Sequence, residues 1–244
     1  MLQKIAIKML GDFSVVADGR CVVDATAKLT KPWQLFCYLA LNREHVTPSS
    51  VLLQELWGGE ELADPANVLK NTVYALRREL AGPVKPAESP ILFRAGGYCL
   101  NGHIKWSVDT ERFEQLCEKA ERCTGGSEAK MAAWRKAEGA FRGELPQLAG
   151  EVWVMRAARG FTRRYLASAR ALCACLAGEN AYGELLDVAS RASVTDPLDE
   201  DIALWTFRAL DALHMQRAIV IAYNKTARYF EEEMGRPLCA EIGS

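Results

Sequence analysis

Long hydrophobic runs are absent from this sequence of 244 residues. No segment approaches the ~18 uninterrupted apolar residues of a membrane-spanning helix, so no membrane span is expected. The N-terminus passes from Met1 to Lys4 directly into a strand-like segment, unlike a secretory signal peptide. From these two absences we expect a cytoplasmic protein.

The motifs of common catalytic sites are absent too. The sequence contains no GxxxxGK(S/T) loop for nucleotide phosphates, no GxSxG nucleophile and no HExxH zinc motif. Its three histidines are not grouped with cysteines at ligand spacing, and no two cysteines form a CxxC pair. We therefore expect no metal, no cofactor and no enzymatic activity.

Cysteine is well represented, with eight residues, but not in a pattern that predicts disulfides. Several cysteines lie within apolar periodic stretches, as Cys37 and Cys173 do. Because no signal peptide is seen, we interpret the cysteines as reduced core thiols of a cytosolic protein.

The overall charge is nearly balanced, at −1. Residues 1–106 carry 12 Lys and Arg against 10 Asp and Glu, and residues 107–244 carry 18 against 21. Neither part would bind a polyanion through its total charge, so any nucleic-acid binding must come from a local patch. With 50% apolar and 25% charged residues, the composition is that of a soluble globular chain of one large or two ordinary domains.

The rest of the sequence is organised around residues 64–82, which carry helix signals at both ends. Asp64 is a good N-cap and Pro65 suits the first helical position. Gly82 followed by Pro83 is a helix stop. Four apolar residues recur at helical spacing and form one stripe: Leu69, Val73, Leu76 and Leu80.

The face opposite that stripe has polar and basic side chains and no acid. At roughly 100° per residue it carries Asn67, Lys70, Asn71, Tyr74 and Arg78, with Arg77 at its edge. Asn can read an adenine edge, Arg can read guanine or hold phosphate, and Lys supplies charge to the backbone. The alternative is an ordinary amphipathic helix with a solvated outer face.

The elements around this helix predict a winged helix-turn-helix. Short apolar runs in residues 4–24, with Asp18-Gly19 as a turn signal, indicate a small antiparallel sheet. Thr30-Lys31-Pro32 opens a helix to about Asn42, and Thr47-Pro48 opens a second to Trp57. Residues 91–100 indicate a hairpin around Gly96-Gly97. The third helix of such a unit is the one that enters a major groove.

Residues 107–244 are helical by pattern. The predicted helices are 109–122, 127–141, 151–177, 181–193, 198–213 and 216–234. Similar segments recur about one repeat apart, which indicates tetratricopeptide-like stacking. The predicted architecture is an α+β winged helix-turn-helix domain (1–106) followed by an all-α tetratricopeptide-like helical-repeat domain (107–244).

Several of these pieces together resemble known regulators. Residues 5–100 resemble the winged helix of OmpR-type response regulators, through Leu56-Trp57-Gly58, the run VYALRREL at 73–80 and the Gly97-Tyr98 wing. The run SVDTERF at 107–113 and the following helices resemble the bacterial transcriptional activator domain. The chain is thus similar to the antibiotic regulatory protein family.

The resemblance implies a sequence-specific transcriptional activator that binds double-stranded DNA, recruits RNA polymerase through residues 58–64, and can form a homodimer on tandem sites. The predicted DNA-binding residues are Asn67, Lys70, Asn71, Tyr74, Arg77, Arg78 and Arg94.

Ala75 stands where the family often has Arg, and Tyr74 replaces a smaller residue, so a different DNA sequence should be recognised. The alternative is a protein-interaction scaffold with a winged helix that no longer binds DNA, which the weak charge and Ala75 favour.

Overall fold

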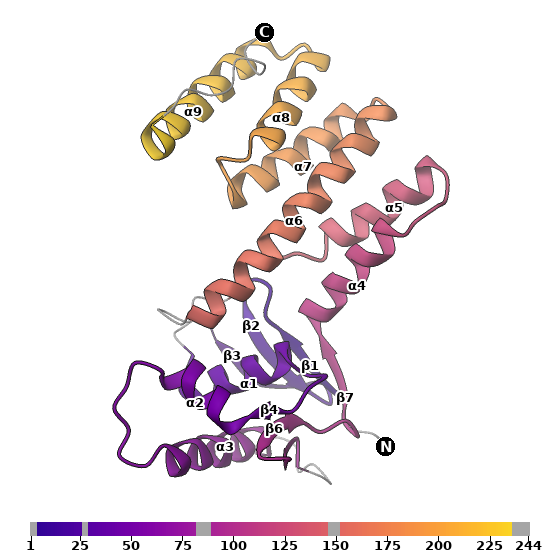
Figure 1. Ribbon diagram of the computed structural model, residues 1–244. Helices are drawn as coiled ribbons and strands as arrows, with labels where there is room; N and C mark the ends of the chain where they lie inside the picture. The colour runs from indigo at the N-terminus through magenta and orange to yellow at the C-terminus, as the bar shows by residue number, and fades with distance from the viewer. Residues whose placement is uncertain (1–3, 26–28, 82–88, 146–151, 236–244) are drawn as a thin grey trace. The chain divides into compact units, whose positions relative to one another are not determined.

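The computed structural model describes residues 4–25, 29–81, 89–145 and 152–235. The chain divides into two compact units. The first comprises Met1–Phe113 and Arg142–Gly160, and the second Glu114–Phe141 and Phe161–Ser244. Helix α6 (Val152–Gly178) contributes residues to both. The predicted fold, a winged helix-turn-helix followed by a tetratricopeptide-like helical domain, is confirmed (Figure 1).

The first unit begins with a four-stranded sheet whose strand order is β3-β2-β1-β7. The strands are β1 (Lys4–Lys8), β2 (Phe13–Ala17), β3 (Arg20–Ala25) and β7 (Lys105–Val108). Asp18 and Gly19 have φ values of 48° and 80°, which match the two-residue hairpin turn that the sequence predicts. Strand β7 was not predicted, and it pairs in parallel with β1.

Three helices pack against one another beside this sheet: α1 (Lys31–Leu41), α2 (Ser49–Trp57) and α3 (Pro65–Ala81). All three were predicted, and their buried apolar residues include Phe36, Leu52 and Leu76. The expectation that Thr47-Pro48 opens α2 is wrong in detail. These two residues form a short strand, β4, and the helix begins after them.

The wing is the predicted hairpin, formed by β5 (Ile91–Arg94) and β6 (Gly97–Leu100). Its turn is Ala95-Gly96 and not the predicted Gly96-Gly97, because Gly97 pairs with Arg94 in the sheet. Strand β4 pairs with β6, which gives a three-stranded sheet of order β4-β6-β5. Gly97 is required at this contact, because a Cβ there would lie 2.2 Å from the carbonyl oxygen of Thr47. The wing is therefore joined to the segment that precedes α2.

The other helices are α4 (Asp109–Glu121), α5 (Ser127–Glu138), α7 (Tyr182–Thr195), α8 (Glu200–Ala212) and α9 (Gln216–Met234). They match the predicted ranges closely, although α5 ends at Glu138, before the predicted residue 141, with Gly139 as its C-cap. No helix among the described residues is long and apolar enough to span a bilayer. The predicted stop at Gly82-Pro83 and Cys239 lie outside the described residues.

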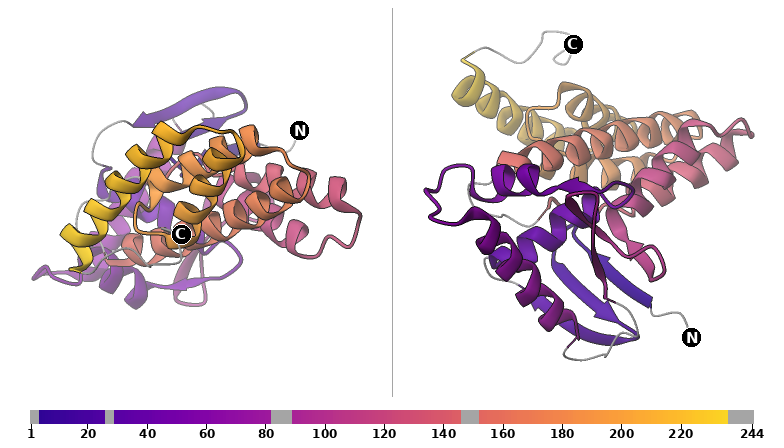
Figure 2. Two further views of the ribbon diagram at one scale, coloured as in Figure 1. Left: turned by 90° about the horizontal axis from the view of Figure 1, so that it is seen from above. Right: turned by 60° about the horizontal axis from the view of Figure 1, so that its bottom comes forward.

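One backbone turn recurs in the second unit and supports the repeat interpretation. The helices that it joins are coloured orange to yellow in Figure 2. Between α6 and α7, Asn180 has a φ of 56°, and the amide of Ala181 donates to the carbonyl of Leu176 over 2.9 Å. Between α8 and α9, His214 has a φ of 57°, and the amide of Met215 donates to Leu210 over 2.9 Å. The same backbone turn thus closes two successive helix pairs, as stacked helical repeats require.

Candidate nucleic-acid interface

Helix α3 begins as its sequence indicates. The Asp64 carboxylate accepts a hydrogen bond from the backbone amide of Asn67 over 3.0 Å, and the Asp64 carbonyl accepts one from Val68 over 3.0 Å. Pro65 is the first helical residue. The N-cap satisfies a backbone donor that has no helical partner and fixes the start of the helix.

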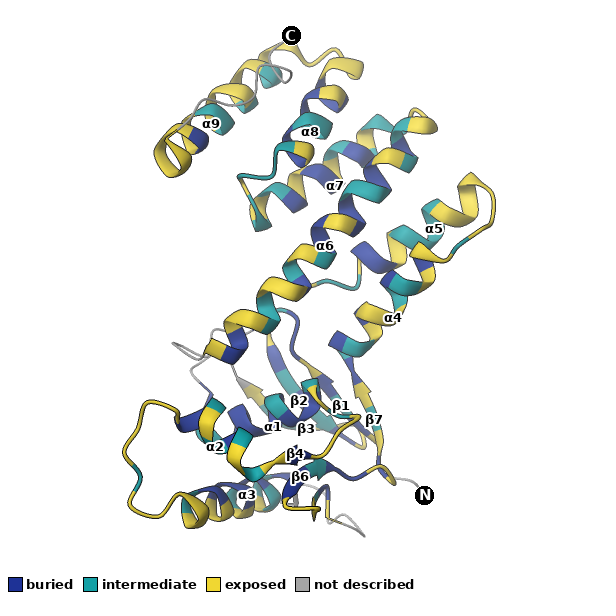
Figure 3. Ribbon diagram, in the orientation of Figure 1, coloured by how far each residue is buried: buried dark blue, intermediate teal, exposed yellow. Residues whose placement is uncertain are grey.

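The apolar stripe of α3 is fully buried, and this decides which side of the helix faces solvent. Leu69, Val73, Leu76 and Leu80 are each at most 2% exposed. Five predicted contact residues lie on the opposite, exposed side (Figure 3): Asn67, Lys70, Asn71, Tyr74 and Arg78. The structure therefore brings these five side chains onto one accessible face of the 17-residue helix.

Arg77 is placed differently from the other predicted residues. Its guanidinium donates two hydrogen bonds to the carbonyl of Ile91, over 3.2 Å from Nε and 2.8 Å from Nη2. The residue is half-buried. Arg77 thus joins α3 to the first strand of the wing, and its charge points toward the hairpin.

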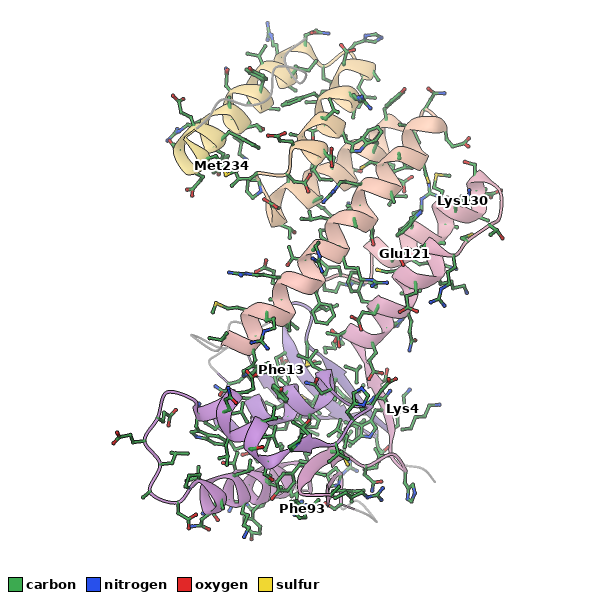
Figure 4. The ribbon with its side chains drawn as sticks, in the orientation of Figure 1. Lys4, Phe13, Phe93, Glu121, Lys130 and Met234 are labelled. Atoms are coloured by element: carbon green, nitrogen blue, oxygen red, sulfur yellow. The ribbon has the colours of Figure 1, made fainter. Side chains whose placement is uncertain are left out.

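The tip of the wing presents Arg94, one of the predicted DNA-binding residues, to solvent, together with an aromatic ring that was not predicted. Phe93 is 59% exposed and its ring centroid lies 5.1 Å from that of the buried Tyr98 (Figure 4). The turn is held in place by Ser49, whose amide and hydroxyl both donate to the Gly96 carbonyl, over 3.1 and 2.9 Å. The hairpin is thus fastened at its tip by Ser49 and at its base by Arg77.

Phe93 could have been found from the sequence by strand alternation. Ile91 and Phe93 lie on the same face of β5, since side chains alternate along a strand. Ile91 is completely buried, and Phe93 projects one step beyond the core. A large aromatic residue just before the turn Ala95-Gly96 was the available signal.

The loop between α2 and α3 has the opposite electrostatic character. Residues 58–64 carry the exposed acids Glu60, Glu61 and Asp64. The start of the loop is held by Lys31, whose ammonium donates to the Leu56 carbonyl and lies 3.3 Å from Glu60. An acidic loop repels phosphate, so this segment is suited to a protein partner.

The cysteines are free, as predicted, in the seven positions that the structure describes. Cys37, Cys117 and Cys173 are buried, and burial raises the pKa of each thiol, that of Cys173 to about 12. The expectation of core thiols is wrong for Cys21, which is exposed on β3. Among the described residues, no group of three or more His, Cys, Asp and Glu side chains could hold a metal ion.

Comparison with known families decides the class of this protein. Residues 25–100 match the family described as transcriptional regulatory protein, C terminal. Residues 108–243, more than half of the chain, match the bacterial transcriptional activator domain. The chain belongs to the bacterial transcriptional activator domain family. It combines this domain with an OmpR-type winged helix, as in regulators of the antibiotic regulatory protein type, and the predicted resemblance is confirmed.

Two individual proteins are similar to this member of the activator-domain family. Regulatory protein DnrI of Streptomyces peucetius is 30% identical over 145 residues, which are 57% of this chain and 52% of DnrI. The chain thus spans about half the length of that relative. EmbR of Mycobacterium tuberculosis, solved in complex with a low-affinity phosphopeptide, matches with a TM-score of 0.72 and 16% identity over 99% of this chain and 63% of EmbR. This second likeness concerns the fold.

Proposed function

We propose that this transcriptional regulator is a sequence-specific DNA-binding activator that recruits RNA polymerase. Residues 1–106 are proposed to bind double-stranded DNA, and residues 107–244 to couple binding to a partner or a second protomer on tandem sites, in the cytoplasm. The observation that carries the proposal is the outer face of α3, where Asn, Lys, Tyr and Arg side chains are exposed together without an acid.

Helix α3 is the element proposed to enter the major groove. The groove is wide enough for one α-helix, and the N-terminal part of a recognition helix reaches the base edges. Asn67, Asn71 and Tyr74 are proposed to contact base edges, and Lys70 and Arg78 are proposed to contact phosphates. Because Arg77 is engaged with Ile91, we propose that it acts chiefly by fixing the position of the wing.

The wing is proposed to meet the DNA backbone or the adjacent minor groove. Arg94 supplies a positive charge for phosphate, and the exposed ring of Phe93 supplies an apolar contact with sugar or bases. The acidic loop of residues 58–64 is proposed to contact RNA polymerase. It is held by Lys31 and has no charge suited to DNA.

The decisive experiment is selection of bound sequences from a random DNA pool with the whole chain. A single enriched motif is expected. On that motif, Asn71→Ala should cost roughly 1–3 kcal/mol and relax the preference at one or two base pairs. Arg78→Ala should weaken binding to every sequence and reduce the slope of log K against log salt by about one.

The matched control is Arg163→Ala, because Arg163 is an exposed arginine of α6 outside the proposed interface. Failure to enrich any motif, with the fold intact by circular dichroism, would favour the alternative of a protein-interaction scaffold. Equal losses by Asn71→Ala on selected and random DNA would contradict base reading by that residue.

A further inference from the structure

Helices α4 and α5 flank a groove in the second unit that DNA binding does not explain. Its volume is about 750 Å³. One wall runs from Gln115 in α4 to Cys123 just after that helix, and the other is the α5 segment from Ala129 to Lys136. At 1.5 Å per residue these walls are roughly 12 Å long, which is about two turns of a helix.

The floor of the groove is apolar and made of small side chains. It is formed by Leu116 from α4, by Cys123 just after that helix, and by Ala129, Ala132 and Ala133 from α5. Short side chains let the backbone of a bound segment come close to the floor. An amphipathic helix fits such a groove with anchors at positions i, i+3 or i+4, and i+7.

The rim of the groove is basic. Lys119 on α4, Arg122 just after α4 and Lys136 on α5 line it, and Glu118 is the one acid among its described lining residues. Glu118 lies 3.5 Å from Arg122 and offsets that charge. Neither Lys119 nor Lys136 has an acidic partner within salt-bridge distance among the residues that the structure describes. The two ammonium groups therefore stand on opposite walls with their charge available to an occupant.

We propose that the α4–α5 groove binds an amphipathic α-helix of a partner protein whose apolar face is flanked by Asp and Glu. The apolar anchors enter between Leu116 and the α5 alanines, and the flanking carboxylates meet Lys119 and Lys136. The charge pairs fix the orientation and speed association, while burial of the anchors supplies most of the affinity.

Two other classes of ligand fit the groove less well. A nucleic-acid backbone needs hydrogen-bond donors along its path, and the floor offers alanine, leucine and cysteine side chains instead. A membrane surface needs projecting apolar side chains, whereas this apolar surface is recessed between two helices. Both ligands are outcomes of the test.

The test uses the whole chain and a designed acidic amphipathic peptide on the order of 20 residues, long enough to form a helix. Its binding is followed by fluorescence anisotropy. The wild-type chain is expected to bind it, whereas a peptide with the same apolar positions and Lys in place of each Glu is expected not to bind. The double variant Lys119→Glu/Lys136→Glu should bind about tenfold more weakly, and this change lies at exposed positions that do not threaten folding.

The matched control is Lys130→Glu, which makes the same charge change on α5 at an exposed residue outside the groove (Figure 4). It should bind the peptide as the wild type does. Ala132→Trp, which fills the floor, should abolish binding without a change of charge.

No binding of the acidic peptide, or equal binding by the wild type and the double variant, would overturn the proposal. Displacement of the peptide by duplex DNA or by vesicles of anionic phospholipid would assign the groove to those ligands instead. None of these outcomes depends on whether α3 binds DNA.

Discussion

Among single residues, the exposed ring of Phe93 offers a contact of a different kind from its charged neighbour Arg94. Phe93→Ala should lower affinity for DNA by roughly 1–3 kcal/mol, as loss of an aromatic contact does. The slope of log K against log salt should stay unchanged, because no phosphate charge is neutralised by a phenyl ring. Salt titrations of binding measure both quantities.

Phe93→Tyr serves as the control, since it keeps the ring and its contact with Tyr98. If Phe93→Ala leaves affinity unaltered while Arg94→Ala weakens it, the ring lies outside the interface. A loss of slope in Phe93→Ala would mean that the substitution displaces the wing rather than removing one contact.

The thiols should divide into a reactive residue and protected residues. An alkylating reagent at about pH 8 should modify the exposed Cys21 and spare the buried Cys37 and Cys173 until the chain unfolds, because the thiolate is the reactive form. Mass spectrometry of the labelled protein measures this. Rapid labelling of Cys173 in the folded chain would contradict its burial.

Burial of Cys173 also predicts a loss of stability at alkaline pH. Burial, aided by the charge of Glu138, raises the pKa of Cys173 from 9.0 to about 12. As pH rises above 9.0, the unfolded state releases this proton while the folded state keeps it. The stability that the protonated Cys173 thiol contributes is therefore fully present below its unfolded pKa and is lost as the pH rises from the unfolded pKa through the folded pKa. When the pH is raised from about 8 to about 10, the urea midpoint of unfolding should fall less in Cys173→Ala than in the wild type.

Between elements, the hydrogen bonds from Arg77 to the Ile91 carbonyl tie helix α3 to the wing. Arg77→Gln should lower the free energy of unfolding by about 1–2 kcal/mol, since a half-buried charged hydrogen bond is lost. DNA affinity should fall on all sequences, with an unchanged salt slope, because the wing is displaced and no phosphate contact is removed. Chemical denaturation and salt titration check the two parts.

Arg78→Ala provides the comparison, because Arg78 is exposed on the same helix. Arg78→Ala should reduce the slope of log K against log salt and leave the free energy of unfolding nearly unchanged. A slope reduced by about one in Arg77→Gln would show that Arg77 leaves Ile91 and meets a phosphate in the complex.

Across the whole chain, Asp109 joins the start of α4 to the first sheet. Its carboxylate accepts hydrogen bonds from the backbone amides of Met9, over 2.9 and 2.8 Å, and of Leu10, over 2.9 Å. Asp109→Ala leaves these amides without their acceptor and should cost about 1–3 kcal/mol of stability in denaturant unfolding. Asp201→Ala, at an exposed acid of α8, is the control.

The same contacts bear on how the chain can be divided. A boundary after residue 106 is our proposal for the DNA-binding domain, and such a fragment lacks Asp109 and half of β7. It also lacks Trp153, whose ring centroid lies 5.1 Å from that of Tyr38. The 1–106 fragment is expected to bind the same DNA sequence as the whole chain but to unfold at lower urea concentration. A fragment as stable as the whole chain would show that these contacts contribute little.

Much of the candidate interface could be predicted from the sequence because it lies on one helix. A regular helix places Asn67, Lys70, Asn71, Tyr74 and Arg78 on one side once its buried stripe is known. Phe93 was missed although its alternation with Ile91 along β5 was a local signal. Arg77 was predicted as a contact residue, but its hydrogen bonds to the Ile91 carbonyl could not be predicted, because they depend on where the wing lies. Whether an arginine at the edge of a helix turns outward or toward a neighbouring carbonyl is set by which strand lies beside it.

Local pattern was sufficient for α1, α2, α3 and both hairpins, because caps, turns and hydrophobic periodicity involve residues close together in the chain. The parallel pairing of β7 with β1 and the inclusion of Arg142–Gly160 in the first unit required the folded chain. These features join segments about a hundred residues apart, and no short-range signal marks which of several apolar segments will meet. Local sequence motifs are thus sufficient to determine the class of the protein. The boundaries of its two units and the direction of the Arg77 side chain depend on packing between segments far apart in the chain.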